Sequence, residues 1–373
     1  MVFIKGFEFS LRELAGSIGD FGTLIPFTVG YIVLCGFDPC GLLLGIGLTN
    51  IFLALAYRLP LPVQPKKVIG SIALAGKWPM QRVLGAGFSV GLIWMILSFS
   101  KRVNRILEQI PNSVVRGVQL GLSFTLALSG ANMVYQNIFF ALPLILLTFL
   151  LLRNRIVPVS IFLVLAGFFF SLISGKLSLS EISVGFTLPH IHLFGLADLY
   201  YGFVYAGFAQ LFLTLSNACV ATVSLIHDLF PDRKDVTPKN LLTNMAAMNL
   251  LTPFIGGMPL CHGSGGLAAQ YLFGARTGGA LLMEGMIEII LGLFFSNSIL
   301  AIFNSFPLAV VGVMLIFTSL ELGKLSLRIT GDKEIFVMLF TALISTAFNI
   351  AAGFVGGVFL YLGLKKGIIK FPE

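Results

Sequence analysis

Long apolar runs, separated by short groups of charged residues, glycines and prolines, follow one another along almost the whole chain. A bilayer core needs about 20 helical residues per span, and most of these runs approach that length. A longer connection, expected to be polar, separates the seventh run from the eighth. The pattern predicts fourteen helical segments, with approximate bounds 13–35, 40–57, 63–76, 80–99, 112–130, 137–152, 156–175, 204–227, 236–255, 261–275, 277–296, 299–319, 332–350 and 353–368.

The composition supports placing these segments in a membrane. Hydrophobic residues make up 57% of the 373 residues and charged residues only 11%, whereas a soluble domain carries about 25% charged residues. A soluble chain of this length has too little interior to bury so much apolar side chain. These numbers exclude a soluble enzyme, a nucleic-acid-binding protein and a disordered chain. They predict an all-α polytopic membrane protein in contact with lipid.

The distribution of basic residues predicts the orientation. With the N-terminus inside, nineteen of the 24 Lys and Arg residues fall on the cytoplasmic side of the fourteen segments, as the positive-inside rule requires. We therefore expect both termini in the cytoplasm and the chain in the cell (inner) membrane. The formal net charge of +8 then says nothing about nucleic acid. Lys66 and Lys67 are exceptions, because both fall within the third segment.

The two halves of the sequence repeat. Pro111 matches Pro307 at an offset of 196 residues, and nearly the same offset pairs 62–65 with 259–262. Seven segments per half is an odd number, so the second copy enters the membrane from the opposite side. The sequence predicts two inverted repeats, residues 1–175 and 204–373, an arrangement found in secondary transporters.

The third segment is too short and too rich in proline for an ordinary span. Pro65 suits the first turn of a helix, so a half-helix beginning there would direct its free N–H groups and positive dipole end into the protein. Lys66 and Lys67 add positive charge at the same place, and a bound anion would balance it. The alternative is a pair of lysines that extend to the membrane surface.

The tenth segment has the same character in the second repeat. Gly263, Gly265 and Gly266 allow close approach of the backbone, and Ser264 adds a hydroxyl, so this run could form an anion-binding nest. Tight helix packing is the alternative explanation for the glycines. Two short, interrupted segments at matched places in inverted halves indicate a transport site.

Carboxylates and polar side chains within the spans are further candidates. Asp20 could bind a proton or pair with one of the lysines, because a buried carboxylate in a membrane needs a role or a partner. Glu284 and Glu288, one helical turn apart, are candidates for proton coupling, with pairing to Arg276 or Arg116 as the alternative. Four polar residues of the eighth segment could bind an oxyanion or join helices: Gln210, Thr214, Ser216 and Asn217.

The sequence gives no indication of a cofactor, a metal site or an enzyme. The four histidines are scattered, no nucleotide-binding loop of the GxxxxGK[ST] type occurs, and Cys261 beside His262 is the only adjacent pair with nucleophile and base character. Neighbouring residues on a helix point in different directions, so this pair does not form a catalytic site.

Several motifs together resemble the molybdate transporter family related to the sulfate permeases. They are Gly19-Asp20-Phe21-Gly22-Thr23 with Pro26, Pro62-Val63-Gln64-Pro65-Lys66-Lys67, Pro111 to Gly121, Gln210 to Asn217, and Cys261 to Gly266 followed by Phe273-Gly274-Ala275-Arg276. The resemblance runs in order over nearly the whole chain. One departure is Lys66, which stands where the family motif carries Met.

The resemblance implies the fold of the sulfate permease and uracil permease superfamily, with substrate held between the half-helices of segments three and ten. It implies a core domain (13–99 and 204–296) and a gate domain (112–175 and 299–368). It further implies a proton-coupled transporter of a tetrahedral oxyanion, molybdate first and sulfate or tungstate next, working by alternating access. An anion channel, a nucleobase permease of the same fold and assembly as a homodimer stay open.

The motifs and the residue chemistry together give the candidate site. The expected substrate contacts are Gln64, Lys66, Lys67, Val68, Gln210, Asn217, Cys261, His262, Gly263, Ser264, Gly265 and Gly266. The expected supporting residues are Gly19, Gly22, Thr23, Pro65 and Arg276, and the expected proton-coupling residues are Asp20, Glu284 and Glu288.

Overall fold

The structure is a computed structural model that describes residues 2–4, 6–99, 111–151, 159–324 and 326–369. The ends of three predicted segments, at 99, 152 and 156, adjoin or fall in the two longer gaps. Within the described residues the chain is mostly α-helical, with four short strands. The side chain of Asn217 lies outside what the structure describes.

The helices and strands of the first half begin with a hairpin and continue to the end of the seventh segment. They are β1 (Val2–Ile4), β2 (Phe7–Phe9), α1 (Leu11–Ser17), η1 (Ile18–Asp20), α2 (Phe21–Cys35), α3 (Pro39–Tyr57), β3 (Val63–Pro65), α4 (Lys67–Ala75), α5 (Met80–Ser98), α7 (Asn112–Tyr135), α8 (Ile138–Leu151), α9 (Val159–Ile173) and η2 (Leu179–Glu181).

The second half begins with a long helix interrupted by two π-helical stretches, η3 and η4. Its elements are α10 (Leu196–Gly202), η3 (Phe203–Gly207), α11 (Phe208–Leu213), η4 (Thr214–Ala221), α12 (Thr222–Leu229), α13 (Pro238–Leu251), η5 (Thr252–Ile255), β4 (Leu260–His262), α14 (Ser264–Phe273), α15 (Gly279–Asn304), α16 (Leu308–Lys324), η6 (Ser326–Arg328), α17 (Asp332–Ala347) and α18 (Ile350–Lys365).

Each of the fourteen predicted segments overlaps one or more of these helices and strands, in this order. Within the described residues, six helices are long and apolar enough to cross a membrane, so the count of fourteen spans stays a prediction. One predicted boundary is wrong: the sequence predicted a break near residue 297, but α15 continues to Asn304 and α16 begins at Leu308. The break falls at Pro307, which lacks the N–H that a continuing helix needs.

The connection between α9 and α10 also differs from the expectation. It lies against α15, where the N–H groups of Gly185 and Thr187 donate to carbonyls of Phe294 and Leu293 at 3.0 and 2.7 Å. Its first part exposes polar residues such as Lys176 and Glu181, whereas farther along apolar side chains face outward, with Val184 and Phe186 70% and 63% exposed. The predicted polar connection is therefore polar only at its beginning, and its later part exposes apolar side chains while its backbone bonds α15.

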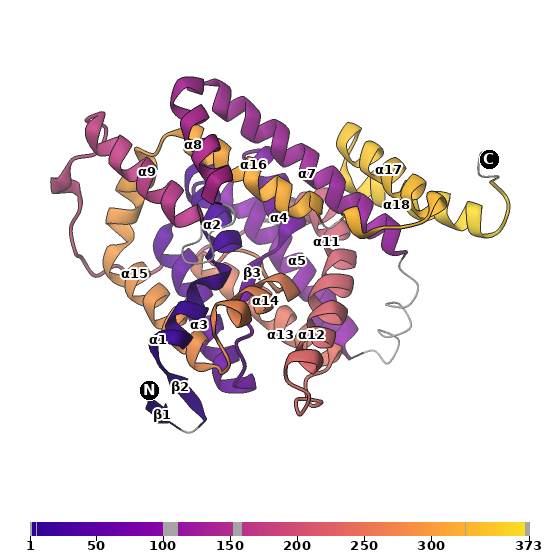
Figure 1. Cartoon of the computed structure of the whole chain (residues 1–373), viewed down its shortest axis with the longest axis horizontal. Coiled ribbons are helices and arrows are strands. Elements are labelled where there is room, and N and C mark those ends of the chain that lie inside the picture. Colours follow the sequence, from indigo (N-terminus) through magenta and orange to yellow (C-terminus); the bar gives the residue numbers. More distant parts are fainter. Residues whose placement is uncertain (1, 5, 100–110, 152–158, 325, 370–373) are drawn as a thin grey trace.

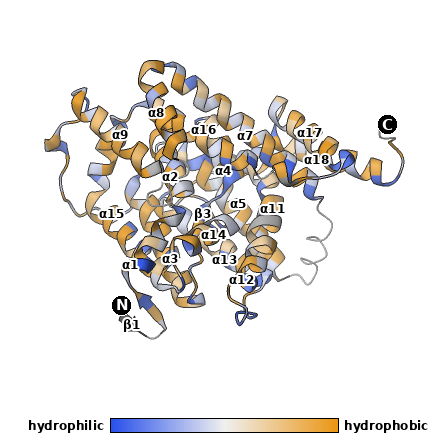
Figure 2. Cartoon of the chain, in the orientation of Figure 1, coloured by the Kyte–Doolittle hydropathy of each residue, from blue (hydrophilic) through white to orange (hydrophobic). Residues whose placement is uncertain are grey.

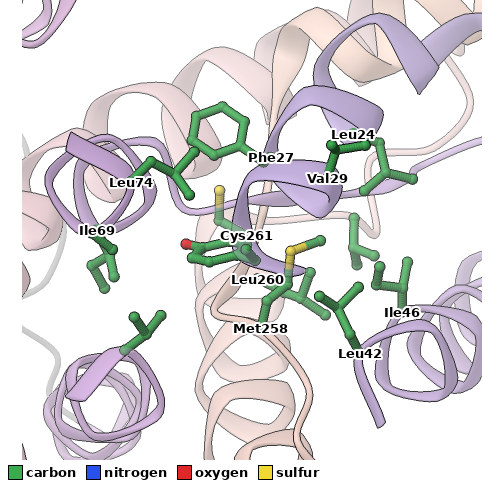
Figure 3. Close-up of a cluster of buried hydrophobic side chains, with 14 of the residues drawn as sticks. Leu24, Phe27, Val29, Leu42, Ile46, Ile69, Leu74, Met258, Leu260 and Cys261 are labelled. Atoms are coloured by element: carbon green, nitrogen blue, oxygen red, sulfur yellow. The ribbon is translucent and has the colours of Figure 1, made fainter. Parts of the chain in front are cut away.

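Strand β3 and the half-helices α4 and α14 lie near the centre of the molecule among longer helices, whereas β1 and β2 lie at its edge beside the N-terminus (Figure 1). Hydrophobic residues cover most of these outer helices, while hydrophilic residues gather in connecting loops such as the one after α12 (Figure 2). Behind the strands, buried side chains of α2, α3, α4 and β4 pack together, including Phe27, Ile46, Leu74 and Leu260 (Figure 3). This packing holds the centre in place.

The long helices pack in pairs that join the first half of the chain to the second. Helix α3 packs on α15 and α13 packs on α5, while α7 packs on both α16 and α17, and α16 packs on α8. Glycines allow the closest approaches: a Cβ added to Gly47 of α3 would lie 2.7 Å from the oxygen of Gly285 of α15, and the reverse distance is also 2.7 Å. Gly130 of α7 and Gly312 of α16 form a second such pair, at 2.6 Å each way.

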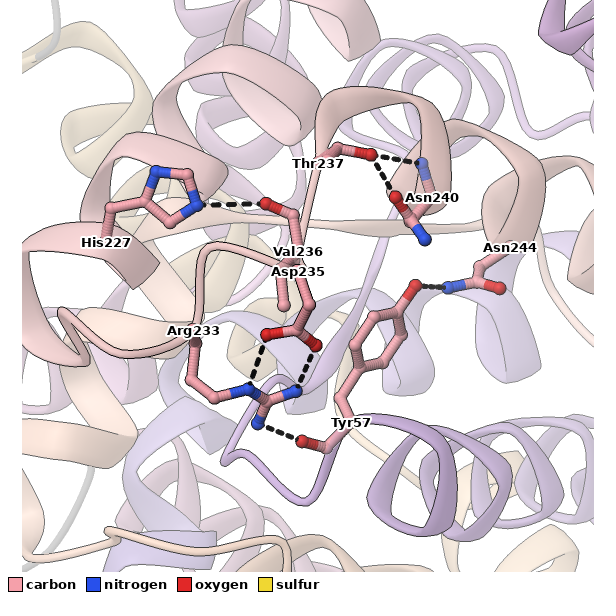
Figure 4. A network of polar contacts seen from close by, with 8 residues as sticks. All are labelled: Tyr57, His227, Arg233, Asp235, Val236, Thr237, Asn240 and Asn244. Atoms are coloured by element: carbon pink, nitrogen blue, oxygen red, sulfur yellow. Dashed lines mark hydrogen bonds and ion pairs between the residues drawn. The ribbon is translucent and has the colours of Figure 1, made fainter.

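A polar network ties the loop between α12 and α13 to the end of α3 (Figure 4). Arg233 donates to the carbonyl oxygen of Tyr57 and forms a two-pronged ion pair with Asp235 at 2.8 Å. Asn244 donates to the Tyr57 hydroxyl, and His227 bonds the carbonyl of Val236. Hydrogen bonds from Arg233 hold the pKa of Asp235 below its usual range. This loop is fixed to the end of α3, which leads into β3.

Candidate substrate-binding site

The centre of the candidate site is an antiparallel pair of three-residue strands. Val63 of β3 lies opposite His262 of β4, and Pro65 lies opposite Leu260. The amide of Lys66 extends the pairing with a 2.9 Å hydrogen bond to the Pro259 carbonyl. A short helix follows each strand, α4 after β3 and α14 after β4. The two helices therefore begin close together, as predicted for the third and tenth segments.

Two asparagines hold these strands, one in each half of the chain. The Asn50 side-chain oxygen accepts the N–H of Val63 at 3.2 Å, and the Asn249 side-chain oxygen accepts the N–H of Leu260 at 3.0 Å. Asn249 also donates to the Leu260 carbonyl. Sequence reasoning missed both residues, although their spacing is close to the repeat offset and would have been a usable signal.

The N-terminus of α4 is capped by Gln210. The Gln210 side-chain oxygen accepts the N–H groups of Val68 and Ile69 at 2.9 and 3.4 Å, and its amide nitrogen donates to Thr214. Gln210 is therefore engaged at both ends and positions the half-helix. Among the described residues, the N–H of Lys67 has no acceptor, so the positive end of α4 is only partly satisfied.

The two neighbouring lysines differ in their surroundings. Lys66 is fully buried, and its ammonium group has no hydrogen-bond acceptor among the described residues. It lies within electrostatic reach of the Cys219 and Cys261 thiols. Lys67, the first residue of α4, is half-buried and lies within electrostatic reach of Asp20. Of the two, Lys67 is the one with access to an incoming ligand.

Two glycines at the N-terminus of α14, Gly263 and Gly266, allow neighbouring side chains to approach its backbone closely. The Gln64 amide donates to Asp20 at 2.5 Å, and a Cβ on Gly266 would lie 2.7 Å from that amide nitrogen and 3.0 Å from the Asp20 oxygen. A Cβ on Gly263 would overlap the Gln64 side-chain oxygen. Gly265, in contrast, is exposed and faces open space, and its N–H has no acceptor among the described residues.

The segment around Asp20 packs on the same half-helix. A Cβ on Gly19 would lie 2.8 Å from the carbonyl oxygen of Ala269 in α14, so glycine permits this contact. Gly22 is exposed with open space around it, and Thr23 is half-buried. Asp20 therefore connects the start of α2 to β3 and α14. Two residues further along the chain, the space beside Gly22 is open.

Arg276 secures the other end of α14. Its guanidinium donates to the carbonyl oxygens of Tyr271 and Ala275 at 2.5 and 2.7 Å and lies 3.6 Å from the centre of the Tyr271 ring. The Glu13 carboxylate accepts the N–H groups of Arg276 and Thr277 at 2.8 and 2.9 Å. Arg276 is therefore placed to support the half-helix rather than to touch a ligand at its N-terminus.

Glu284 and Glu288 lie behind the strands and are joined to them through amides. The Gln270 amide of α14 donates to Glu284 at 2.7 Å, and the Asn50 amide donates to Glu288 at 3.0 Å. Neither carboxylate forms an ion pair within the described part of the chain, so the expected alternative of pairing with Arg276 or Arg116 does not occur. No group of three metal-ligating residues occurs among the described residues.

The structure thus brings together the predicted residues of both half-helix N-termini, with Gln64, Gln210 and Asp20 as their supports. Cys261 and His262 are buried members of β4, and the Cys261 thiol lies 3.7 Å from the Pro65 carbonyl. The site has two partly unsatisfied helix N-termini and an accessible lysine, which together favour an anion.

Comparison with known proteins agrees with this geometry. A family model described as "Molybdate transporter of MFS superfamily" matches residues 12–126 and 202–322. Molybdate transporter 1 of Arabidopsis thaliana is 29% identical over 96% of this chain and 89% of its own length. Molybdate transporter 1 of Chlamydomonas reinhardtii is 25% identical over 94% of this chain and 91% of its own length.

Solved structures share the fold at lower identity. The transmembrane domain of the cyanobacterial bicarbonate transporter BicA superposes with a TM-score of 0.67, at 14% identity, covering 95% of this chain and 97% of that domain. The structure of SLC26A9 gives a TM-score of 0.71 at 13% identity, covering 97% of this chain and 66% of that protein. The fold is therefore that of these transporters, and the resemblance read from the motifs is confirmed.

The protein is an integral membrane transporter and not an enzyme. Since the family model covers well over half of the 373 residues, the chain belongs to the molybdate transporter family.

Proposed function

We propose that the protein transports a tetrahedral oxyanion, molybdate first and sulfate or tungstate as alternatives, and binds it between the N-termini of α4 and α14. The observation that carries the proposal is the meeting of these two N-termini beside Lys67, with the N–H groups of Lys67 and Gly265 lacking acceptors among the described residues. The names of the relatives support molybdate as the first substrate to test.

A doubly charged oxyanion fits this arrangement on physical grounds. Each helix N-terminus carries about half a positive charge, and the lysine adds a full charge, so a dianion is attracted from several directions. Its four oxygens can accept N–H groups from both half-helices and the ammonium of Lys67. Molybdate and sulfate share shape and charge, so discrimination between them depends on the size of the space beside Gly265.

We further propose that core and gate domains move against each other to expose the site to either side, with the second boundary between them at Pro307, because α15 is continuous to Asn304. The half-helices are tied into the core by Asn50, Asn249 and Gln210. The contact of α4 and α11 with the gate helices α7 and α18 is made by apolar side chains, including Val68 and Leu213 on one side and Val118 and Phe354 on the other. Such a surface can slide without breaking a polar network.

The transport test uses purified protein in liposomes, with labelled molybdate or sulfate outside and with or without a pH gradient. We expect saturable molybdate uptake that an inward proton gradient accelerates, in a chain whose termini face the cytoplasm of the native membrane. Absence of saturable oxyanion uptake would overturn the proposed function. Non-saturating flux with single-channel currents would instead indicate an anion channel.

A further inference from the structure

Two carboxylates that no substrate contact explains lie behind the candidate site. Glu284 and Glu288 of α15 are one helical turn apart and only 1% and 3% exposed. Each has one oxygen bonded to a side-chain amide, while the other oxygen has no partner among the described residues. Two buried carboxylates at this spacing oppose each other's ionisation.

The groups on neighbouring elements do not neutralise the pair. The titratable residues on the elements packed against α15 are Glu8, Arg12, Glu13, Asp20, Tyr31, Cys35, Cys40 and Tyr57, with Lys176 and Glu181 in the connecting segment near its far end. Asp20 acts on both glutamates electrostatically and adds negative charge. None of these residues forms an ion pair with Glu284 or Glu288 within the described ranges.

The buried polar groups around Glu284 and Glu288 include hydrogen-bond acceptors for which no donor is present among the described residues. Besides the two free carboxylate oxygens, the side-chain oxygen of Gln270 is fully buried and has no donor among the described residues. The other end of this amide is directed at Glu284. A proton on either carboxyl group would supply a donor that this cluster lacks, because a protonated carboxyl both donates and accepts.

The amides also connect the pair to both halves of the substrate site. Asn50 bonds Glu288 through its nitrogen and accepts the Val63 N–H of β3 through its oxygen. Gln270 belongs to α14 and joins Glu284 to that half-helix. A change in the protonation of the pair therefore alters groups that hold β3 and α14, and a change at those elements acts back on the pair.

Charge balance gives the direction of this coupling. Lys66, Lys67 and the two helix N-termini, at about half a charge each, together balance Asp20, Glu284 and Glu288 when all three are ionised and the site is empty. A dianion adds two negative charges in a region of low dielectric, where uncompensated charge is strongly unfavourable. Protons on both glutamates restore the balance.

We propose that Glu284 and Glu288 are the proton-binding site of this transporter, and that each dianion is bound together with two protons. This inference rests on the proposed function, because it requires that a dianion occupies the N-termini of α4 and α14. Each proton adds to one carboxylate oxygen and leaves it on release, and no other bond changes. The loaded site then carries no more charge than the empty one.

Proton uptake on binding measures the coupling directly. Sodium molybdate is added to the full-length wild-type protein in detergent, in a weakly buffered solution with a pH indicator, at an alkaline pH at which both carboxyl groups of the empty site are ionised. We expect uptake of about two protons per bound molybdate, since binding and protonation are linked. E284Q and E288Q each preserve shape and hydrogen-bond reach, and each should lower the uptake to about one.

The double variant and a matched control complete the experiment. The double variant should bind molybdate without proton uptake, and E181Q, in the exposed connection, should behave as the wild type. Proton uptake that persists in the double variant would place the proton on another group, Asp20 first, and overturn the inference. Wild-type binding without proton uptake would overturn it while leaving the proposed function intact. No molybdate binding at all would overturn the proposed function.

The wild-type protein alone also decides the question if the variants fail to fold. Where both glutamates are ionised before binding, uptake of two protons makes the molybdate affinity fall about a hundredfold for each pH unit of increase. Burial favours the protonated form of both groups, so this fall is expected on the alkaline side. An affinity that stays constant from about pH 6 to about pH 10 would contradict the inference.

Discussion

At the scale of single residues, the site depends on a contrast between adjacent lysines. Lys67 is half-buried at the first position of α4, whereas Lys66 is fully buried, so only Lys67 is accessible to an anion that arrives from solvent. The sequence placed both lysines at the site and could not distinguish them. The two residues differ in backbone conformation, since Lys66 is the extended N-cap of α4 and Lys67 is its first helical residue, so their side chains leave the backbone in different directions.

Replacement of Lys67 tests this assignment. Lys67→Ala should weaken molybdate binding by about 1.5–3 kcal/mol, the range of a charge-assisted hydrogen bond, which is roughly 10- to 100-fold in affinity. Binding is measured on purified protein, and Lys176→Ala, an exposed lysine of the connecting segment, is the matched control. Equal affinity in Lys67→Ala and the control would remove Lys67 from the site.

Two glycines of α14 provide a second residue-scale prediction. Gly266→Ala places a Cβ against Gln64 and Asp20, so we expect a loss of about 1–3 kcal/mol in folding stability together with loss of uptake. Gly265→Ala meets open space, so stability should be unchanged while the new methyl group occupies the proposed anion position and weakens uptake. Thermal unfolding and uptake are measured on both variants. Full uptake by Gly265→Ala would contradict the proposed anion position.

At the scale of elements, the order of helices could be predicted from hydrophobic periodicity, but two features could not. The break before α16 was placed ten residues too early, because Asn297 and Ser298 read as a polar interruption, whereas Ser298 bonds the connecting segment at Ser183. Asn50 and Asn249 read as ordinary helix residues, because their role depends on strands that are distant in sequence. Composition carries no information on such contacts.

The glycine crossing of α3 and α15 gives an element-scale prediction. Gly285→Ala directs a Cβ at the Gly47 carbonyl, 2.7 Å away, and because backbone cannot move aside as a flexible side chain does, the helices must separate. We expect destabilisation by about 1–3 kcal/mol, seen as a lower Tm in detergent. Gly356→Ala in α18, whose nearest neighbour is a Phe340 ring atom at 3.5 Å, should leave the Tm unchanged. Equal values for both variants would show that the crossing is not tightly packed.

At the scale of the whole molecule, the helices of the proposed core and those of the proposed gate each pack mostly among themselves. Helices α3, α5, α13 and α15 hold each other and the strands through close glycine contacts and buried amides. Helices α7, α16, α17 and α18 pack on one another, and α18 meets α11 through stacked Phe212 and Phe354, with ring centres 3.8 Å apart. This grouping of contacts is what supports the proposed core and gate.

A reversible cross-link tests whether the two parts move during transport. The substitutions Phe212→Cys and Phe354→Cys, followed by oxidation or a short bifunctional thiol reagent, join α11 to α18. The four native cysteines are buried and are kept. If transport requires sliding at this surface, uptake should stop on cross-linking and return on reduction, while molybdate binding to one side persists.

The control pair, Ser183→Cys with Ser298→Cys, joins the connecting segment to α15, where the wild-type residues are already bonded at 2.7 and 3.0 Å. That cross-link joins the connecting segment to α15, away from the contact between α11 and α18, and should leave uptake unchanged. Uptake that continues at the wild-type rate with α11 fully cross-linked to α18 would show that the site reaches both sides of the membrane without relative motion of these helices.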